Sequence, residues 1–396
     1  VILSVFLDEV KKYGLLYPPD PTEKDCFIGG TAATNASGEK TFKYGPTRDY
    51  IIALEVVLPD GEMLELKRGE VLAVKNKLKL ETCTGKIIKI TLPEVNMPPV
   101  KNASGYFIKN NMDAIDLFIG SEGTLGVITK IGLRLLVQPE KVISCVIFFN
   151  TEQDALSYIK KSRNLSFNTR ARNLPDSIDA LALEFFDENA LLFLRDAYPQ
   201  IPSGAKAGVW FEQVVNTSNE DVILEEWMKL ISEFNGNEDS AWFAFSEADK
   251  IKIQEFRHAI SAKVNEYISK NNFRKLGTDV AVPDNEFEEL YYFSKKLVHD
   301  NNIHSVIYGH FGNSHMHLNM LPRTNEEFLT GQELYLQICR KAIELGGTIS
   351  AEHGVGKLKT KYLLEMYGYD TITKMIKLKK TFDPNMIMGI GNMFPL

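Results

Sequence analysis

Five of the seven histidines lie between residues 304 and 353. From His315 to Met320 polar and apolar residues alternate, which predicts a strand with His317 and Asn319 on the same face as His315. Glycines on both sides of His310 predict a turn that brings this histidine back beside the strand. The sequence therefore gathers several imidazoles in one place.

Imidazoles at this spacing are common metal ligands, although a His-x-His pattern alone occurs more often without a metal. A carboxylate is the third ligand type to look for. Glu352 supplies one, shortly after residues 347–350, which are expected to be strand-like. Two imidazoles and a carboxylate form a divalent-metal set that keeps coordination positions open.

Two segments are dense in small residues, at 29–38 and at 118–129. Glycines allow a backbone to approach a ligand closely, and their N–H groups can hold phosphate or carbonyl oxygens. Either segment alone is more often an ordinary turn. Neither matches G-x-G-x-x-G or G-x-x-x-x-G-K-[ST], so the sequence supports neither a Rossmann dinucleotide site nor a P-loop.

Hydrophobic periodicity predicts the elements that position these residues. An amphipathic helix is expected over 1–16, and strands are expected at 51–58, 130–138 and 142–149. Longer helices are expected over 221–234, 247–271, 285–301 and 326–345. The chain beyond residue 139 therefore has a mixed α+β character without repeats.

Composition narrows the class of protein. The 396 residues are 44% hydrophobic and 24% charged with a net charge of −7, which indicates a globular protein and argues against a nucleic-acid partner. The four cysteines form no C-x-x-C pair, so neither an iron–sulfur cluster nor a zinc knuckle is supported. No apolar run has the length of a membrane span, and Val1–Phe6 lacks the features of a signal peptide. A cytoplasmic location is expected, with docking at a membrane surface through a partner left open.

The small-residue segments together carry a family resemblance. Pro18-Pro19-Asp20-Pro21, Ile28-Gly29-Gly30, Asn35-Ala36-Ser37-Gly38, Tyr44-Gly45, Arg48-Asp49 and Gly120–Gly126 resemble, in order and spacing, the FAD-binding domain of the FAD-linked oxidases of the vanillyl-alcohol oxidase type. Within that family the D-lactate, glycolate and D-2-hydroxyglutarate dehydrogenases are most similar. The resemblance implies that the residues near FAD are Gly29, Gly30, Asn35, Gly120, Ser121, Glu122, Thr124, Gly126 and Ile128.

The histidine region resembles the same family, whose pattern is Gly-His, Gly-Asp-Gly-Asn, His-x-Asn and later Gly-Glu-His-Gly. This implies His310, His317 and Glu352 as ligands of a divalent zinc, manganese or iron ion. It implies His353 as the catalytic base and Asn319 as a substrate or flavin contact. Four residues depart from this pattern. Asn313, Ser314 and His315 stand where the family has Asp, Gly and Asn, and Ala351 stands where it has Gly. Gly389 likewise stands where the family usually has an asparagine near FAD. His315 is either a fourth ligand or a space-filling residue, and we expect the second.

A 2-hydroxy acid needs a cation for its carboxylate. Arg257 is the candidate because a guanidinium binds a carboxylate through two N–H groups, and Lys275 is a weaker second candidate. Most arginines on helices are solvated, but the helix of Arg257 precedes Asp279-Val280-Ala281-Val282-Pro283, which resembles the family's order of substrate arginine and strand.

The resemblance implies FAD-dependent oxidation of a D-2-hydroxy acid, with hydride transfer to the flavin. The implied electron acceptor is a quinone, a cytochrome or an electron-transfer flavoprotein, and a homodimer is left open. Alternatives are a flavin oxidase acting on another alcohol, a non-catalytic subunit that keeps the fold, and a metallohydrolase built on the His/Glu set.

The expected domains are the second part of an α+β FAD-binding domain at 1–138, an antiparallel-sheet cap domain with helices at 139–345, and a segment at 346–396 that returns to the FAD domain. In the family, a glycine-rich pyrophosphate loop precedes the point that corresponds to Val1. The expectation is therefore that a first part is missing here and that the chain alone binds FAD weakly.

Overall fold

The computed structural model describes residues 1–244 and 246–395, which divide into two compact units. Unit 1 comprises Val1–Gly38, Gly45–Gln138 and Ala342–Leu396, and unit 2 comprises Glu39–Tyr44 and Pro139–Lys341. The C-terminal segment therefore packs with the N-terminal part of the chain. Glu39–Tyr44 groups with unit 2 although it falls within the range expected to form the flavin-binding domain.

Unit 1 is built on a three-stranded antiparallel sheet of order β3-β2-β6, a hairpin of β4 and β5, and a small β1–β7 pair. Its strands are β1 (Leu15–Leu16), β2 (Ile51–Val57), β3 (Met63–Lys67), β4 (Lys77–Glu81), β5 (Ile87–Thr91), β6 (Val127–Leu133) and β7 (Leu136–Val137). Its helices are α1 (Leu3–Lys11), α2 (Ile28–Thr34), η1 (Thr47–Tyr50), α4 (Ile115–Phe118) and α11 (Thr360–Phe382).

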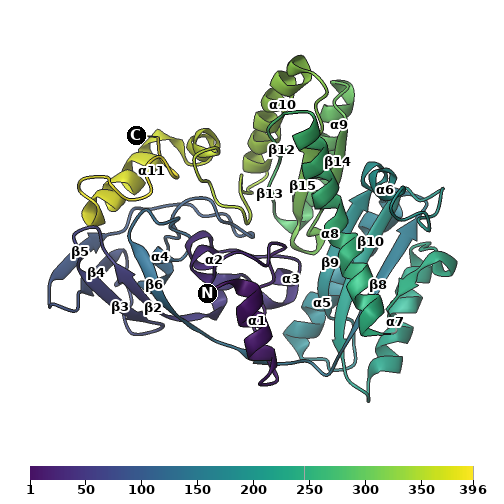
Figure 1. Cartoon of the computed structure of the whole chain (residues 1–396), viewed down its shortest axis with the longest axis horizontal. Coiled ribbons are helices and arrows are strands. Elements are labelled where there is room, and N and C mark those ends of the chain that lie inside the picture. Colours follow the sequence, from purple (N-terminus) through teal and green to yellow (C-terminus); the bar gives the residue numbers. More distant parts are fainter. Residues whose placement is uncertain (245, 396) are drawn as a thin grey trace. The chain divides into compact units, whose positions relative to one another are not determined.

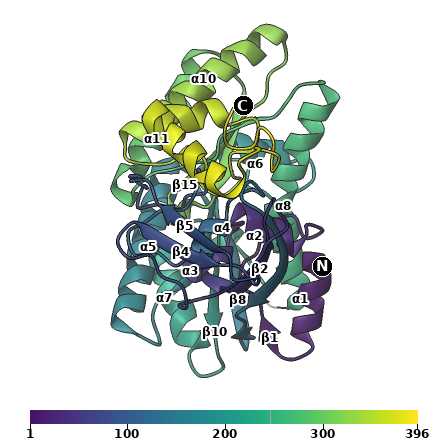
Figure 2. The same ribbon diagram turned by 90° about the vertical axis from the view of Figure 1, so that its left-hand side faces the viewer.

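The hairpin shows how the sequence sets this packing. Exposed and buried residues alternate along β4 and β5, as a strand with one covered face requires. The buried side chains, such as Ile88 and Ile90, join a core cluster with Met375 and Leu378 of α11. Helix α11 thus lies beside the hairpin (Figures 1 and 2).

Three local expectations in unit 1 were wrong. The helix expected over 1–16 ends at Lys11, because Gly14 adopts φ +69° and the next two residues pair with β7 as strand β1. The small-residue stretch at 29–38, which taken alone was more often expected to be an ordinary turn, begins with helix α2, which ends at Asn35 in the left-handed conformation. Residues 347–350, expected to be strand-like, form a loop with a single bridge position.

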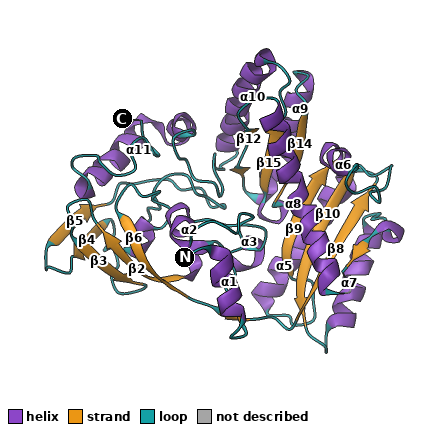
Figure 3. Ribbon diagram, in the orientation of Figure 1, coloured by secondary structure: helices purple, strands orange, loops and turns teal. Residues whose placement is uncertain are grey.

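Unit 2 is an eight-stranded antiparallel sheet of order β11-β8-β10-β9-β14-β15-β12, with β13 paired to β15 (Figure 3). Its strands are β8 (Lys141–Phe149), β9 (Ala180–Asp187), β10 (Ala207–Val215), β11 (Trp242–Phe243), β12 (Leu276–Gly277), β13 (Val280–Ala281), β14 (Ser305–Gly309) and β15 (His315–Met320). Its helices are α3 (Thr41–Tyr44), α5 (Glu152–Arg172), α6 (Glu188–Leu194), α7 (Glu220–Glu233), η2 (Glu238–Ser240), α8 (Glu247–Lys270), η3 (Asp284–Glu286), α9 (Phe287–Asp300), η4 (Phe311–Asn313) and α10 (Asn325–Glu344).

Helices cover both faces of this sheet. On one face Phe148, Phe186 and Trp210 pack with buried residues of α6 and α8. On the other face the ring of Phe211 stacks on Trp227 of α7 at 4.0 Å, and Tyr158 of α5 lies beside both. Adjacent residues on a strand point to opposite faces. Because both faces are covered by helices, these strands are apolar along most of their length. The predicted strand at 142–149 and the four predicted long helices are confirmed within two residues at each end.

Candidate active site

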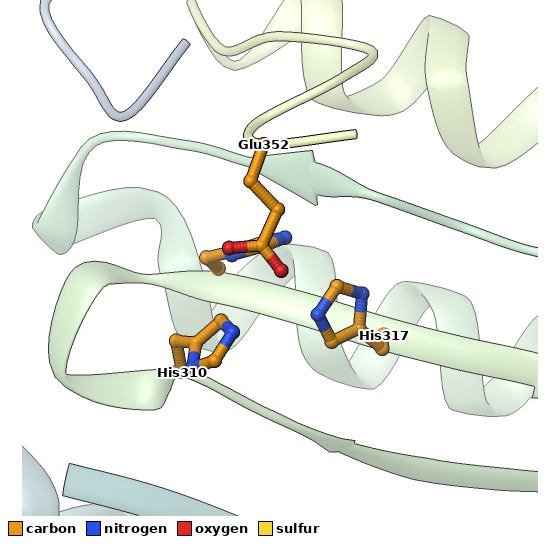
Figure 4. A group of neighbouring side chains, drawn as sticks. His310, His317 and Glu352 are labelled. Carbon is orange, nitrogen blue, oxygen red and sulfur yellow. The ribbon is translucent and has the colours of Figure 1, made fainter. Parts of the chain in front are cut away.

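The histidine cluster of unit 2 is built on β14, the short turn η4 and β15. Gly309 ends β14 with φ +141°, and a Cβ there would be 3.1 Å from the His317 ring and 3.2 Å from the His315 carbonyl oxygen. Only glycine therefore lets the chain turn so closely against β15. Figure 4 shows His310 and His317 projecting toward the same region from this turn and strand. One ring nitrogen from each of His310, His315 and His317 lies within 4.8 Å of the others.

Each of the three imidazoles also has a hydrogen-bond acceptor within unit 2. His310 Nδ1 donates to Glu184 Oε1 at 2.7 Å, and His315 Nε2 donates to Asp279 Oδ1 at 2.8 Å. His317 Nδ1 donates to the carbonyl oxygen of Thr278 at 3.2 Å. Such bonds fix the tautomer and orientation of an imidazole.

Glu184 also binds Arg257. It lies on β9, fully buried, and its Oε2 accepts from Arg257 Nε at 2.9 Å and lies 2.7 Å from a terminal nitrogen of the same guanidinium. A second buried carboxylate, Glu39, lies 3.8 Å from Arg257 Nε and 3.7 Å from His258 Nε2. Arg257 is thus buried between two carboxylates of its own unit, not solvated on the surface of α8.

The charges of Glu184 and Arg257 stabilise each other. Burial opposes the ionised form of Glu184, but His310 and Arg257 outweigh it and hold the pKa of Glu184 below its usual range. Burial likewise opposes the charge of Arg257, and Glu184 and Glu39 outweigh it, so the pKa of Arg257 is raised. The guanidinium is therefore fully charged, and one of its five N–H groups donates to Glu184, while a terminal nitrogen lies 2.7 Å from the same carboxylate.

Asn319 lies on β15 opposite Gly277 and is buried. Neither its amide oxygen nor its amide nitrogen has a hydrogen-bond partner among the described residues. A Cβ on Gly277 would come within 2.5 Å of the Asn319 oxygen, so glycine makes room for this amide. A buried amide of this kind is costly unless a ligand or water satisfies it.

Glu352 and His353 belong to unit 1. Glu352 is buried, and its Oε2 accepts from Lys101 Nζ at 2.6 Å and from Ser37 Oγ at 3.0 Å. The side chain of His353 is 55% exposed, and its Nε2 lies 3.5 Å from Glu352 Oε1. The loop that follows is anchored by Glu122, which accepts from the backbone N–H groups of Val355 and Gly356 at 2.6 and 2.8 Å.

The residues expected near FAD divide into two kinds. Gly29 and Gly30 lie on α2, and an added Cβ at either would meet nothing within 4 Å. Protein packing therefore does not demand glycine at either position. Ile128 is half-buried on β6.

The other residues of that set are engaged within unit 1. Asn35 Oδ1 accepts from the Arg48 N–H at 2.9 Å, and Gly120 adopts φ +79° beside Asn35. The hydroxyl of Ser121 donates to Phe118 O at 2.8 Å. That of Thr124 donates to Ser121 O at 2.7 Å.

Two further positions in this region are explained by packing. A Cβ on Gly126 would lie 2.7 Å from Val56 Cγ1, so this glycine is needed against β2. Gly389, with φ +52°, would bring a Cβ to 3.0 Å from Thr124 Cγ2.

Comparison with known families decides the class. The family model described as FAD linked oxidases, C-terminal domain, matches residues 167–393, and the one described as FAD binding domain matches residues 1–67. The first match alone spans more than half of the chain. The chain belongs to the FAD-linked oxidase family.

Curated proteins with similar sequences support this family assignment. A D-lactate dehydrogenase of Anaerostipes hadrus is 29% identical over 99% of this chain and 74% of its own length. The glycolate oxidase subunit GlcD of Bacillus subtilis is 30% identical over 100% of this chain and 74% of its own length. The chain spans between 58% and 75% of the length of the curated relatives that it matches.

Solved structures support the fold. The 4-ethylphenol oxidase of Gulosibacter chungangensis has a TM-score of 0.65 at 15% identity, covering 100% of this chain and 75% of that one. The predicted α+β class, a flavin-domain fold of the vanillyl-alcohol oxidase type with an antiparallel-sheet unit, is confirmed. Among the described residues, no helix combines the length and the apolar character needed to cross a membrane.

For this FAD-linked oxidase, two functional candidates escaped the sequence reasoning. Glu184 and Asp279 are both fully buried carboxylates, each bound to a histidine. A signal existed for Glu184, because it is an ionisable residue inside the apolar run of β9. Ionisable residues in such runs are rarely buried without a partner.

Proposed function

We propose that this chain catalyses the FAD-dependent oxidation of a D-2-hydroxy acid, of the D-lactate, glycolate or D-2-hydroxyglutarate type, to the 2-oxo acid. The names of its relatives support the substrate class. The observation that carries the proposal is Asn319, a buried amide with both polar atoms unsatisfied among the described residues. By strand alternation it shares the face of β15 that carries His315 and His317.

Arg257 and Asn319 are proposed to bind and orient the substrate. The guanidinium of Arg257 keeps N–H groups beyond those given to Glu184, and these donate to the substrate carboxylate. Because Glu184 fixes the plane of the guanidinium, little side-chain entropy is lost when the acid binds. The amide of Asn319 then finds its missing partner in the substrate or the flavin.

His353 is proposed as the general base. When bound, FAD supplies the acceptor for the hydride that leaves C2, and a divalent ion held by His310, His317 and Glu352 supplies a Lewis acid for the 2-hydroxyl. A ring nitrogen of His353 takes the hydroxyl proton. The proton and the hydride together account for the two hydrogens lost by the hydroxy acid. Reoxidation is assigned to a quinone, a cytochrome or an electron-transfer flavoprotein.

Anaerobic titration of the flavin spectrum tests this function. Flavin-loaded protein should bleach on addition of D-lactate or D-2-hydroxyglutarate and should respond at least tenfold more weakly to the L-enantiomers, on the order of a 1.4 kcal/mol difference between the two transition states. Bleaching by NADH alone, with no response to any hydroxy acid, would overturn the proposal. Turnover of a simple alcohol with oxygen as acceptor would point to the oxidase alternative.

A further inference from the structure

His315 replaces an asparagine of the family pattern, and unit 2 places it between two other histidines. We propose that His315 is itself a metal ligand, so that His310, His315 and His317 form a three-histidine site for a divalent ion within unit 2. This replaces the expectation that His315 only fills space. It rests on the metal-binding part of the proposed function and enlarges the ligand set named there.

The first support is that ring nitrogens of the three histidines lie close together. One nitrogen from each ring lies within 4.8 Å of the others. The ring centroids are separated by 5.2 Å for His310 and His315, 5.5 Å for His310 and His317, and 4.4 Å for His315 and His317. Around an ion with metal–nitrogen distances of about 2.0–2.1 Å, ligand atoms lie roughly 3–4 Å apart. A small contraction would therefore bring the three nitrogens to a shared ion.

The second support is the hydrogen-bond acceptor that each ring has. Metal-binding histidines almost always donate the opposite N–H to a carboxylate or a backbone carbonyl, which fixes the nitrogen that carries the lone pair. Each of the three histidines has an acceptor of this kind for one ring nitrogen: Glu184, Asp279 and the Thr278 carbonyl. His315 is oriented by its acceptor in the same manner as the two expected ligands.

A purely structural role for His315 does not explain the orientation of its ring. A space-filling histidine needs an acceptor for one N–H, which Asp279 provides, but it has no reason to direct its ring toward two other imidazoles. All three side chains are buried, so their ring nitrogens need partners inside the protein.

The set also predicts which ions bind. Imidazole ligands suit zinc, iron, nickel and copper, whereas oxygen ligands suit magnesium, calcium and manganese. Three imidazoles therefore favour zinc or iron(II) over manganese. With His315 as a ligand, Glu352 is a fourth ligand and no longer one of three. The ion should therefore remain bound when the Glu352 carboxylate is removed.

The test compares zinc affinity in the flavin-loaded full chain, measured by competition with a chromogenic chelator. His315→Asn, which restores the family residue, should weaken zinc binding on the order of a hundredfold. Asp279→Asn should weaken it by about 10–100-fold through loss of the orienting acceptor. Glu352→Gln should bind zinc more tightly than His315→Asn does.

X-ray absorption of the zinc-loaded wild type supplies a measurement that needs no variant. Three imidazoles are expected around zinc, and two in His315→Asn. Wild-type zinc affinity in His315→Asn, or two imidazoles in the wild-type spectrum, would overturn this inference while leaving the set of His310, His317 and Glu352 intact. Absence of zinc binding by the wild type would overturn both metal assignments, and the flavin titration with hydroxy acids still tests the reaction separately.

Discussion

Glu184 joins the two parts of the candidate site in unit 2, because one of its oxygens faces His310 and the other faces Arg257. A buried carboxylate in this position can serve both metal binding and substrate binding. It also raises a question about Arg257, whose charge is already balanced by two carboxylates. Arg257 either binds the substrate or only holds Glu184.

Arg257→Lys separates these roles. An ammonium lacks the planar fork, so kcat/KM for a D-2-hydroxy acid should fall by about one to two orders of magnitude, the scale of roughly 1.5–3 kcal/mol for a charged hydrogen bond. The methyl ester of the same acid has no carboxylate to bind, so its kcat/KM should change much less. Equal losses for acid and ester would show that Arg257 only positions Glu184.

His353→Gln tests the base. Its ring is more than half exposed and lies next to Glu352, so the substitution removes the proton acceptor without opening a cavity in the core. Turnover should fall by about two to four orders of magnitude, the usual contribution of a general base. Flavin content and zinc affinity should stay near wild type. A variant that loses flavin or zinc as well would show that His353 is structural.

The predicted site was partly readable from the sequence. Alternation from His315 to Met320 and the glycines around His310 gave the correct strand and turn, because both are local properties. Glu184 and Glu39 are distant in sequence from Arg257 and became neighbours only through the sheet and the return of residues 39–44 to unit 2. All six residues of β15 are buried, including His315, His317 and Asn319 on its polar face.

At the level of elements, helix α2 shows why local rules were insufficient. Two glycines and several small residues, taken alone, indicated an ordinary turn, yet the segment is helical because its buried positions, including Ile28 and Ala32, pack in unit 1. Tertiary packing overrides weak helix propensity of this kind. The long helices of unit 2 were predictable because their apolar periodicity extends over many turns.

Two glycine substitutions distinguish cofactor contact from packing. Gly29→Ala meets no neighbour, so it should raise the unfolding free energy of the flavin-free protein by about 0.5–1 kcal/mol, the helix preference for alanine. If FAD approaches this helix, the same change should weaken FAD binding. Denaturant unfolding and flavin fluorescence measure the two effects.

Gly126→Ala is the matched control. Its Cβ would lie 2.7 Å from Val56 Cγ1 and 2.8 Å from the Val57 carbonyl oxygen, so β2 or β6 must shift. We expect the unfolding free energy to fall by about 1–3 kcal/mol, the scale of overpacking. Unchanged FAD affinity in Gly29→Ala would contradict the assignment of α2 to the cofactor surface.

The N-terminus of helix α6 gives a pH-dependent prediction. Asp187 caps this helix by accepting from Ala190 N at 2.7 Å, and burial raises the pKa of its carboxyl to about 7. The folded protein therefore binds this proton more tightly than the unfolded chain, whose carboxyl has a pKa of about 3.9. Between these values the folded state binds more protons, so stability falls as pH rises.

Asp187→Asn keeps a capping oxygen and removes the proton equilibrium. The unfolding free energy of the variant should accordingly fall less than that of the wild type between pH 4 and about pH 7. Urea titrations at several pH values measure both slopes. Parallel slopes in the two proteins would mean that Asp187 does not carry this proton.

At the scale of the whole molecule, the chain forms two units with cores of their own. Leu117 and Ile119 belong to a cluster of unit 1, and Ile253 and Ile260 belong to a cluster of unit 2. The flavin surface is assigned to unit 1, and the three histidines lie in unit 2. Proteins with several domains often depart from a single two-state transition, so each ligand should act first on the unit that binds it.

Calorimetry of the flavin-free, metal-free chain should therefore show two transitions, identified by the conservative core changes Ile119→Val in unit 1 and Ile260→Val in unit 2. Each change should cost about 0.5–1.5 kcal/mol and lower the transition of its own unit. Zinc at about one hundred times its dissociation constant should stabilise the transition lowered by Ile260→Val by about 2.7 kcal/mol, and FAD should stabilise the other. The zinc shift should shrink in His315→Asn, because that variant keeps the core but loses a proposed ligand. A zinc effect confined to the transition lowered by Ile119→Val would place the ion in unit 1 and exclude a three-histidine site.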